Sequence, residues 1–330
     1  MRLSVRAFFL AALLGLLACA VPASPPPLAR ESRSPVADGS PRQAAPAGKK
    51  APVRLAAWNV ANFFDDVDHP GNDTVLTRAQ YDKKVKEVAG VLAGLDADFV
   101  GLVEVENIDC LRALNAALDK PYPQFGLIEG NDRDRGIDVA FLSRLPVASV
   151  ISHKDHDLPD APGVSRNYKF SRDCLEVRLA TSPPTTLFVN HFKSQLGSKK
   201  SSAAKRRVQA QAVVEIAETT ARELPNGVEV VMGDLNDRPE SWSLEPLMNA
   251  YTDIYADWPE AMRATHRSRR GASALDHILV SRDAVPRMED PRVWQNAGRP
   301  TSDHDPVSVV LRLDKEPTPA NGRTWTASDR

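Results

Sequence analysis

Short apolar runs alternate with segments of helical period after the first fifty residues. In residues 75–95, Tyr81, Val85, Val88 and Leu92 recur every three or four positions, which predicts an amphipathic helix. Two further helices are predicted at residues 108–118 and 204–224. Apolar runs of strand length predict buried strands at residues 53–60, 99–105, 136–142, 147–151, 174–179, 187–190, 228–232, 275–280 and 306–313. Because several of these strands follow one another without a helix, we expect a layered α/β fold with more than one sheet.

The N-terminus has the pattern of an export signal. Arg2 and Arg6 precede an apolar run at residues 7–18, which is shorter than the roughly 20 residues that a membrane-spanning helix needs. The run ends in Leu-Leu-Ala followed by Cys19, which resembles a bacterial lipobox. We therefore expect residues 1–18 to be a signal peptide and Cys19 to carry a lipid anchor. The alternative is an ordinary signal peptide cleaved downstream, for example after Ala23.

Composition divides the rest of the chain. Residues 19–52 are rich in Pro, Ala and Ser without any apolar period, which is typical of a disordered tether. Residues 53–313 then form one folded domain, and residues 314–330 a loose tail. An exported lipoprotein of the periplasm, outer membrane or cell surface, or a secreted protein, is the predicted location.

Charge and composition exclude several classes of protein. With 26% charged and 42% hydrophobic residues, the 330-residue chain is neither a disordered polyanion nor a polytopic membrane protein. The first 50 residues hold seven of the 42 basic and two of the 43 acidic residues, so the remainder has a net charge of −6. Proteins that coat nucleic acid are usually basic overall. A polyanionic substrate would therefore have to be held by local basic patches and metal ions.

The cysteines leave two possibilities open. If Cys19 is lipidated, Cys110 and Cys174 remain as an even pair in an oxidising compartment. They form either a disulfide or two buried free thiols, and the sequence provides no distance that chooses between them.

Polar residues gather where predicted strands begin or end. They are Asn59, Glu104, the run Gly233-Asp234-Leu235-Asn236, the pair Asp276-His277 and the run Ser302-Asp303-His304-Asp305. Taken singly, such residues are also common in turns and caps. Glu104 interrupts an apolar run, where a carboxylate needs a partner or a metal ion. Oxygen donors without nearby Cys favour Mg²⁺, with Mn²⁺ or Ca²⁺ as alternatives, over structural zinc.

Six motifs together resemble the endonuclease/exonuclease/phosphatase superfamily, in that family's order. They are Trp58-Asn59-Val60, Gly-Leu-Val-Glu104-Val, Asn190-His191-Phe192-Lys193-Ser194, Gly233-Asp234-Leu235-Asn236, Leu275-Asp276-His277-Ile278-Leu279 and Ser302-Asp303-His304. The resemblance covers residues 53–313 and is strongest to secreted bacterial nucleases similar to deoxyribonuclease I. It implies an α/β fold in four layers, with two mainly antiparallel sheets packed face to face and helices outside.

The resemblance also implies roles for single residues. Glu104 and Asp303, with Asn59, resemble the metal site. Asp276 resembles the residue that orients His304, which deprotonates or positions the attacking water. Asp234 and Asn236 resemble the pair that aligns the nucleophile and stabilises the transition state.

Three further residues resemble the deoxyribonuclease I branch. The resemblance implies that His191 protonates the leaving 3′ oxygen, that Glu129 orients His191, and that Arg172 contacts phosphate or braces Glu129. The alternatives are a satisfied loop histidine for His191 and a surface ion pair for Glu129 and Arg172. The branch's groove-inserting Arg is replaced by Glu106, and the Tyr before Glu129 is absent. Ala61 stands where the abasic-site repair branch has an acidic residue.

Two basic clusters flank these motifs, and we expect them to contact phosphates, although charge runs are often only solvated faces. One contains Lys199, Lys200, Lys205, Arg206 and Arg207, and the other contains Arg263, His266, Arg267, Arg269 and Arg270. The sequence thus predicts a monomeric, metal-dependent phosphodiesterase that cleaves DNA, with RNA as the alternative. Its rivals are a phosphatase or sphingomyelinase-like hydrolase of the same superfamily, and a non-catalytic binding module on the same fold.

Overall fold

The computed structural model describes residues 52–69, 74–269 and 271–315. All of them belong to one compact unit, Ala44–Arg330. The expected signal peptide, Cys19, nearly all of the expected tether and most of the expected tail lie outside the described residues, so these stay predictions. None of the described helices combines the length and apolar character that a bilayer span requires.

Two six-stranded sheets form the centre of this unit. The first sheet has the order β13 (Met288–Val293), β14 (Val307–Leu311), β1 (Val53–Phe63), β2 (Phe99–Val105), β4 (Asp138–Ser143) and β3 (Gln124–Ile128). The second has the order β5 (Val147–Ser152), β6 (Cys174–Leu179), β7 (Thr185–His191), β8 (Val228–Asp234), β12 (Asp276–Ser281) and β9 (Tyr251–Asp253). Only β1–β2 and β7–β8 pair in parallel, so both sheets are mainly antiparallel.

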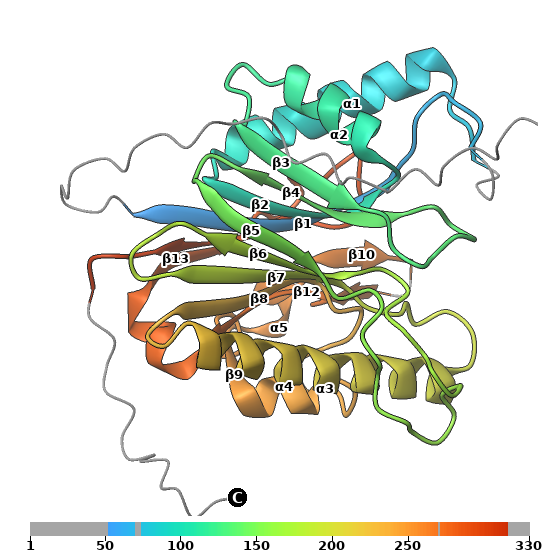
Figure 1. Ribbon diagram of the computed structural model, residues 1–330. Helices are drawn as coiled ribbons and strands as arrows, with labels where there is room; N and C mark the ends of the chain where they lie inside the picture. The colour runs from blue at the N-terminus through green and yellow to red at the C-terminus, as the bar shows by residue number, and fades with distance from the viewer. Residues whose placement is uncertain (1–51, 70–73, 270, 316–330) are drawn as a thin grey trace, which may run out of the picture. The chain divides into compact units, whose positions relative to one another are not determined.

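Helices cover the outer face of each sheet (Figure 1). Helices α1 (Arg78–Leu95) and α2 (Ile108–Ala116) lie on the first sheet, and α3 (Lys199–Glu223) and α4 (Glu245–Ala250) lie on the second. The remaining elements are α5 (Glu260–Arg263), the hairpin of β10 (His266–Ser268) and β11 (Gly271–Ser273), and the 3₁₀ helix η1 (Arg282–Arg287). The predicted four-layer α/β sandwich is confirmed.

Three apolar clusters hold the layers together. The cluster between the sheets includes Leu55, Val103, Leu187, Val230 and Ile278, all fully buried. A second cluster lies under α1 and α2, and a third lies under α3 and α4. Burial of apolar surface is the dominant favourable contribution to folding, so each sheet is fixed to both of its neighbours.

The two cysteines lie in different layers of this packing. Cys110 belongs to the cluster under α1 and α2, and Cys174 to the cluster under α3 and α4. Both are buried and free. Of the two possibilities left open by the sequence, the structure therefore selects buried thiols, because the sheets separate the two side chains.

Candidate active site

The predicted site residues lie at one edge of both sheets. Asn59 and Glu104 lie near the carboxyl ends of β1 and β2. In the second sheet His191 is the register partner of Asp234, which is in turn the partner of Asp276. Adjacent strands thus place the side chains of His191, Asp234 and Asp276 next to one another. Asn59 and Glu104 lie across from them, in the first sheet.

Asn59 connects the two sheets. Its Nδ2 donates to Asp234 Oδ2 over 2.9 Å and approaches Glu104 Oε1 at 3.3 Å. His191 Nε2 lies 3.7 Å from both of these carboxylates. Distant segments of the chain therefore meet in one cluster of buried polar groups.

A carboxylate orients the imidazole of His304. Nδ1 of His304 lies 2.7 Å from Asp276 Oδ2, and its Nε2 lies 3.9 Å from Asp234 Oδ2. Burial alone lowers the pKa of His304, but Asp276 and Asp234 outweigh burial and raise it. The pKa of Asp234 is raised by burial and by the charge of Asp276. The 3.9 Å separation is too long for a direct hydrogen bond, but a water molecule could contact both groups by donating to Asp234.

Close backbone packing places His304 and Asp234. Trp58 Nε1 donates to the carbonyl oxygen of His304 over 3.0 Å. A Cβ on Gly233, at φ +123°, would lie 2.2 Å from the backbone oxygen of Asn190. Only glycine permits this contact, which keeps β8 beside β7 at the position where Asp234 meets His191.

Several residues at the same edge have a left-handed backbone conformation. Glu104 and Asn236 have φ values of +66° and +56°, and Asn62 has +50°. Left-handed conformations of residues other than glycine cost on the order of 1–3 kcal/mol each and cluster at functional sites. One result is that the Asn62 N–H donates to Glu104 Oε2 over 2.9 Å. The backbone of Asn236 likewise donates to Asp234 Oδ1 over 2.8 Å.

The metal role expected for Glu104 and Asp303 stays a prediction. Among the described residues at this edge, the groups whose ligand atoms lie close enough to share an ion are His266, Asp303 and His304, and Asp234, Asp276 and His304. A hydrogen bond with His266 and the charge of His304 lower the pKa of Asp303 to about 2, so its carboxylate is ionised as a metal ligand must be. Its side chain is 58% exposed and therefore accessible to an ion. Ionised oxygen donors of this kind suit Mg²⁺, Mn²⁺ or Ca²⁺.

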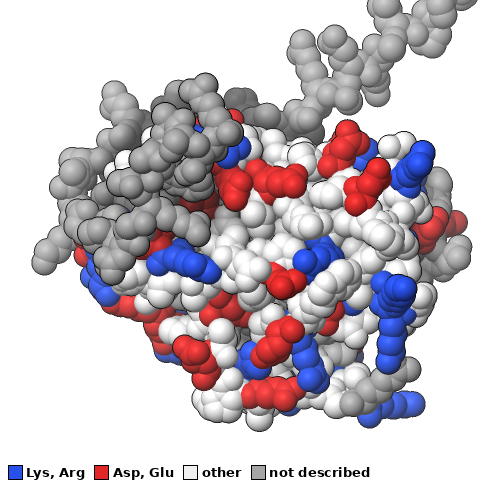
Figure 2. Space-filling view, turned by 90° about the horizontal axis from the view of Figure 1, so that it is seen from below, with Lys and Arg blue, Asp and Glu red and all other residues white. Residues whose placement is uncertain are grey.

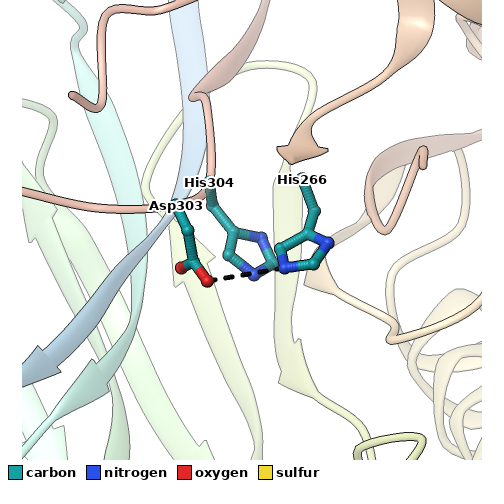
Figure 3. Close-up of side chains that lie close together, drawn as sticks. All are labelled: His266, Asp303 and His304. Atoms are coloured by element: carbon teal, nitrogen blue, oxygen red, sulfur yellow. Dashed lines mark ion pairs between the residues drawn. The ribbon is translucent and has the colours of Figure 1, made fainter. Parts of the chain in front are cut away.

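His266 completes one side of this region (Figure 3). It comes from β10, which forms a bridge with the backbone of His304. Its Nε2 lies 3.4 Å from Asp303 Oδ2, and ligand atoms of His266, Asp303 and His304 all lie within 4.8 Å of one another. The sequence predicted phosphate contact for His266 as part of a basic cluster. It did not predict the hairpin that brings His266 next to Asp303, because β10 and β11 have no apolar pattern.

The side-chain amide of Asn59 is held in one orientation. Its side-chain oxygen accepts the N–H of Ala61 over 2.9 Å. The nitrogen therefore faces Glu104 and Asp234 and donates to both. The oxygen keeps a second lone pair, so a contribution of Asn59 to the metal site stays a prediction.

Glu129 and Arg172 are not paired with each other. Glu129 is exposed, and its backbone oxygen accepts from Lys154. Among the described residues, Nδ1 of His191 is buried without a hydrogen-bond partner, so the expected brace from Glu129 is not formed. Arg172 is 2% exposed and pairs with Asp132 at 2.8 Å, which is a buried ion pair. Burial and the charges of Arg172 and Arg135 lower the pKa of His191, so the imidazole is neutral.

Arg206 is also buried, which corrects its assignment to substrate contact. Its guanidinium pairs with Asp237 at 2.8 Å and donates to the backbone oxygen of Lys193 over 3.0 Å. Since its side chain is 4% exposed, it cannot reach a phosphate without breaking this pair. Arg206 instead braces the loop that carries Asp234 and Asn236.

The other expected phosphate contacts lie nearer the surface. Lys205 is half-buried, with its Nζ 5.1 Å from the ring centroid of Tyr168. Arg267 lies 3.5 Å from Asp305, and Arg269 is exposed. Arg270 lies outside the described residues, so its role stays a prediction.

Two cations near the site were not predicted. Arg135 approaches Glu104 Oε2 at 3.6 Å and donates to Asn62 Oδ1 over 2.6 Å. Lys84 donates to the backbone oxygens of Val60, Ala61 and Thr301 over 2.5 to 2.8 Å. In the sequence, neither Arg135 nor Lys84 differs from the other charged residues near it, so no pattern indicated a role at the site.

A four-layer sandwich with clustered carboxylates and an oriented imidazole at one edge defines a hydrolase of phosphoesters. The chain belongs to the endonuclease/exonuclease/phosphatase family, which matches residues 54–277. This is a superfamily of metal-dependent phosphoesterases and nucleases that act on nucleic acid or other phosphorylated substrates. No curated protein sequence matches the chain.

Solved structures show the same fold. A family protein from Bacteroides thetaiotaomicron is 20% identical, with a TM-score of 0.55 over 81% of this chain and 97% of that one. Truncated TDP2 from Caenorhabditis elegans is 14% identical, with a TM-score of 0.57 over 79% and 97%. The human Nocturnin catalytic domain, solved with a bound sulfate anion, is 15% identical, with a TM-score of 0.52 over 78% and 93%.

Proposed function

We propose that this protein is an exported, monomeric nuclease that hydrolyses phosphodiesters of DNA with a divalent metal ion, Mg²⁺ in the first instance. The observation that carries the proposal is the series of close approaches, 2.7 to 3.9 Å, from Asp276 through His304, Asp234 and Asn59 to Glu104. Phosphoryl transfer needs in-line positioning and compensation of charge on the phosphoryl oxygens. This series can position the reacting groups, and cations have to supply the compensation.

The residues divide the work of hydrolysis. A divalent ion bound by Glu104 and Asp303 would supply charge compensation on the phosphate. His304, held by Asp276, and Asp234 face one point from two sides and position the attacking water there. Neutral His191 donates an N–H to a phosphate oxygen, and Asn236 stays next to Asp234 through its backbone bond.

Local positive charge favours a polyanionic substrate. The charges of Arg172, Arg135 and Lys193 all lower the pKa of His191, so positive charge lies near this imidazole. The charge of Lys205, in the first turns of α3, likewise lowers the pKa of Lys193. On the face shown in Figure 2, basic and acidic side chains are interspersed. The positive charge near His191 supports binding through a few phosphate contacts at the site.

Plasmid cleavage tests the proposal. We expect the purified protein to nick circular DNA with Mg²⁺, to stop after EDTA, and to lose about 10²- to 10⁴-fold in rate in His304→Ala. His156→Ala changes a half-buried histidine outside the site and serves as the control. A His304→Ala protein of full activity would contradict the mechanism. Hydrolysis of phosphomonoesters or sphingomyelin without any cleavage of DNA or RNA would instead indicate the rival substrate class.

Salt dependence tests the phosphate contacts. Each phosphate contact that is lost reduces the slope of log K against log salt by about 0.9 for duplex DNA. Lys205→Ala and Arg269→Ala should each flatten this slope, measured by fluorescence anisotropy with Ca²⁺ in place of Mg²⁺. An unchanged slope in both variants would remove these residues from the proposed binding surface.

Export with a lipid at Cys19 remains part of the proposal. Mass spectrometry of the mature N-terminus is the direct measurement. A diacylated or triacylated Cys19 is expected, and an unmodified start downstream of it would contradict lipidation.

A further inference from the structure

A second cluster of potential metal ligands lies outside the proposed active site. Asp65 follows β1, Glu106 follows β2, and His69 lies in the segment before α1. One ligand atom from each of these three residues lies within 4.8 Å of the others. Asp65 and Glu106 are only 6% and 7% exposed, although both are acidic. Two buried carboxylates at one place need compensation by positive charge.

The amide of Asn107 is fixed beside this cluster. Its Oδ1 caps α2 by accepting the N–H groups of Asp109 and Cys110 over 2.9 and 2.8 Å. Its Nδ2 is therefore directed at Asp65 Oδ2, at 2.9 Å, and lies 3.4 Å from His69 Nε2. The position of this donor is thus determined by the helix cap and not by the cluster.

His69 faces the carboxylate of Asp65 beside a second donor. Its Nε2 lies 3.3 Å from Asp65 Oδ2 and 3.4 Å from Asn107 Nδ2. If Nε2 carries a proton, it shares the acceptor Asp65 Oδ2 with Asn107 Nδ2; if it does not, its lone pair faces that carboxylate oxygen. In the second state a cation between Nε2 and Oδ2 would be bound by both atoms. The 3.3 Å separation agrees with ligands at about 2.0–2.2 Å from one ion, which lie roughly 3.0–3.5 Å apart.

We propose that Asp65, His69 and Glu106 bind a first-row divalent transition ion such as Zn²⁺, separate from the cation of the active site. The imidazole favours such an ion over Mg²⁺ or Ca²⁺, which prefer oxygen ligands alone. The role of the ion is to brace the segment after β1. Glu106 Oε2 already accepts the N–H of Asp65 over 2.7 Å, while Asn62, at the end of β1 just before this segment, donates to Glu104.

Metal binding by His69→Ala tests this proposal. The side chain of His69 is 44% exposed, so its removal leaves the core intact. Protein stripped with EDTA is titrated with Co²⁺, with bound metal measured by elemental analysis and by visible absorption. We expect His69→Ala to bind one equivalent fewer than wild type and His156→Ala to bind the wild-type number. Equal stoichiometry and spectra in His69→Ala and wild type would overturn the proposal.

Two further measurements guard against a folding defect. Glu106→Gln retains an oxygen that accepts from Asp65, and it should also lose one equivalent of Co²⁺. In the wild-type protein, Zn²⁺ should slow hydrogen exchange of the amides at residues 64–69 and 106–110 while excess Mg²⁺ is present. Unchanged exchange in these segments would contradict the proposed metal site, and this measurement needs no substitution. Such a result would not bear on the proposed nuclease activity.

Discussion

Asn59 donates its side-chain amide to Asp234 over 2.9 Å, although 175 positions separate the two residues in the chain. The bond joins β1 of one sheet to the end of β8 in the other. Ser302 adds a third segment by donating to the backbone oxygen of Asn59 over 2.7 Å. The proposed active site therefore exists only when the two sheets are packed against each other.

Replacing this amide should affect both activity and stability. In Asn59→Asp a third carboxylate lies between Glu104 and Asp234, and the donor to both is lost. We expect kcat to fall by about 10²-fold or more, as for other preorganised donors, and Tm to fall as well. Asn249→Asp, an exposed change on α4, is the control. Wild-type kcat in Asn59→Asp would show that the bridge is dispensable.

Arg206 and Arg207 should behave differently although they are adjacent. Arg206→Ala removes the ion-pair partner of Asp237, which is 18% exposed and keeps a hydrogen bond from Ser243, so we expect the free energy of unfolding to fall by about 1–3 kcal/mol. Arg207 pairs with Glu245 nearer the surface, at 24% exposure, so Arg207→Ala should cost about 1 kcal/mol or less. Urea unfolding measures both. If Arg206→Ala is as stable as Arg207→Ala, the bracing role is wrong.

Lys84 should stabilise the segment that carries Asp303. Its Nζ binds backbone oxygens from both β1 and the loop at Thr301. Lys84→Met leaves these acceptors without their donor, and we expect a loss of about 1–3 kcal/mol in unfolding free energy together with a lower kcat. Lys83→Met is the matched control, since Lys83 on the same helix is 71% exposed. Equal stability of the two variants would refute the role.

His277 should make stability depend on pH. Its Nδ1 lies 2.9 Å from Asp253 Oδ2, and its Nε2 lies 2.9 Å from the backbone oxygen of Asp237. Burial alone lowers the pKa of His277, but Asp253 outweighs burial and raises it. Stabilisation by the protonated ring is therefore complete below the unfolded pKa of about 6.5 and is lost as the pH rises through the folded pKa.

The measurement is the unfolding free energy of wild type and His277→Gln across this range. We expect the difference between them to be largest at about pH 6 and to shrink toward about pH 9. His156→Gln should show no such trend. A difference that grows with pH would contradict the assignment of a stabilising protonated ring.

The regular elements that the sequence predicted best are those buried on both faces. β2 and β6 begin and end at the predicted residues. β2 is an apolar run interrupted by Glu104, and β6 has apolar residues at positions 174, 175, 177 and 179 although it contains Glu176 and Arg178. β3, β9, β10, β11 and β13 were missed. β3 and β13 are only partly buried, β10 and β11 have no apolar period, and β13 contains Pro291. Partial burial leaves no period in the sequence that distinguishes a strand from a loop.

The sequence by itself determined the residues of the proposed reaction, since Asp234, Asp276 and His304 each lie in a short local motif at a strand end. Only the tertiary structure decided which charged side chains accompany them. Arg206 is buried on Asp237, Glu129 is exposed, and His266 meets Asp303. The physical reason is that a local motif specifies which side chain stands at the end of a strand. Whether a charged side chain is paired, buried or exposed depends on the residues that tertiary packing places next to it.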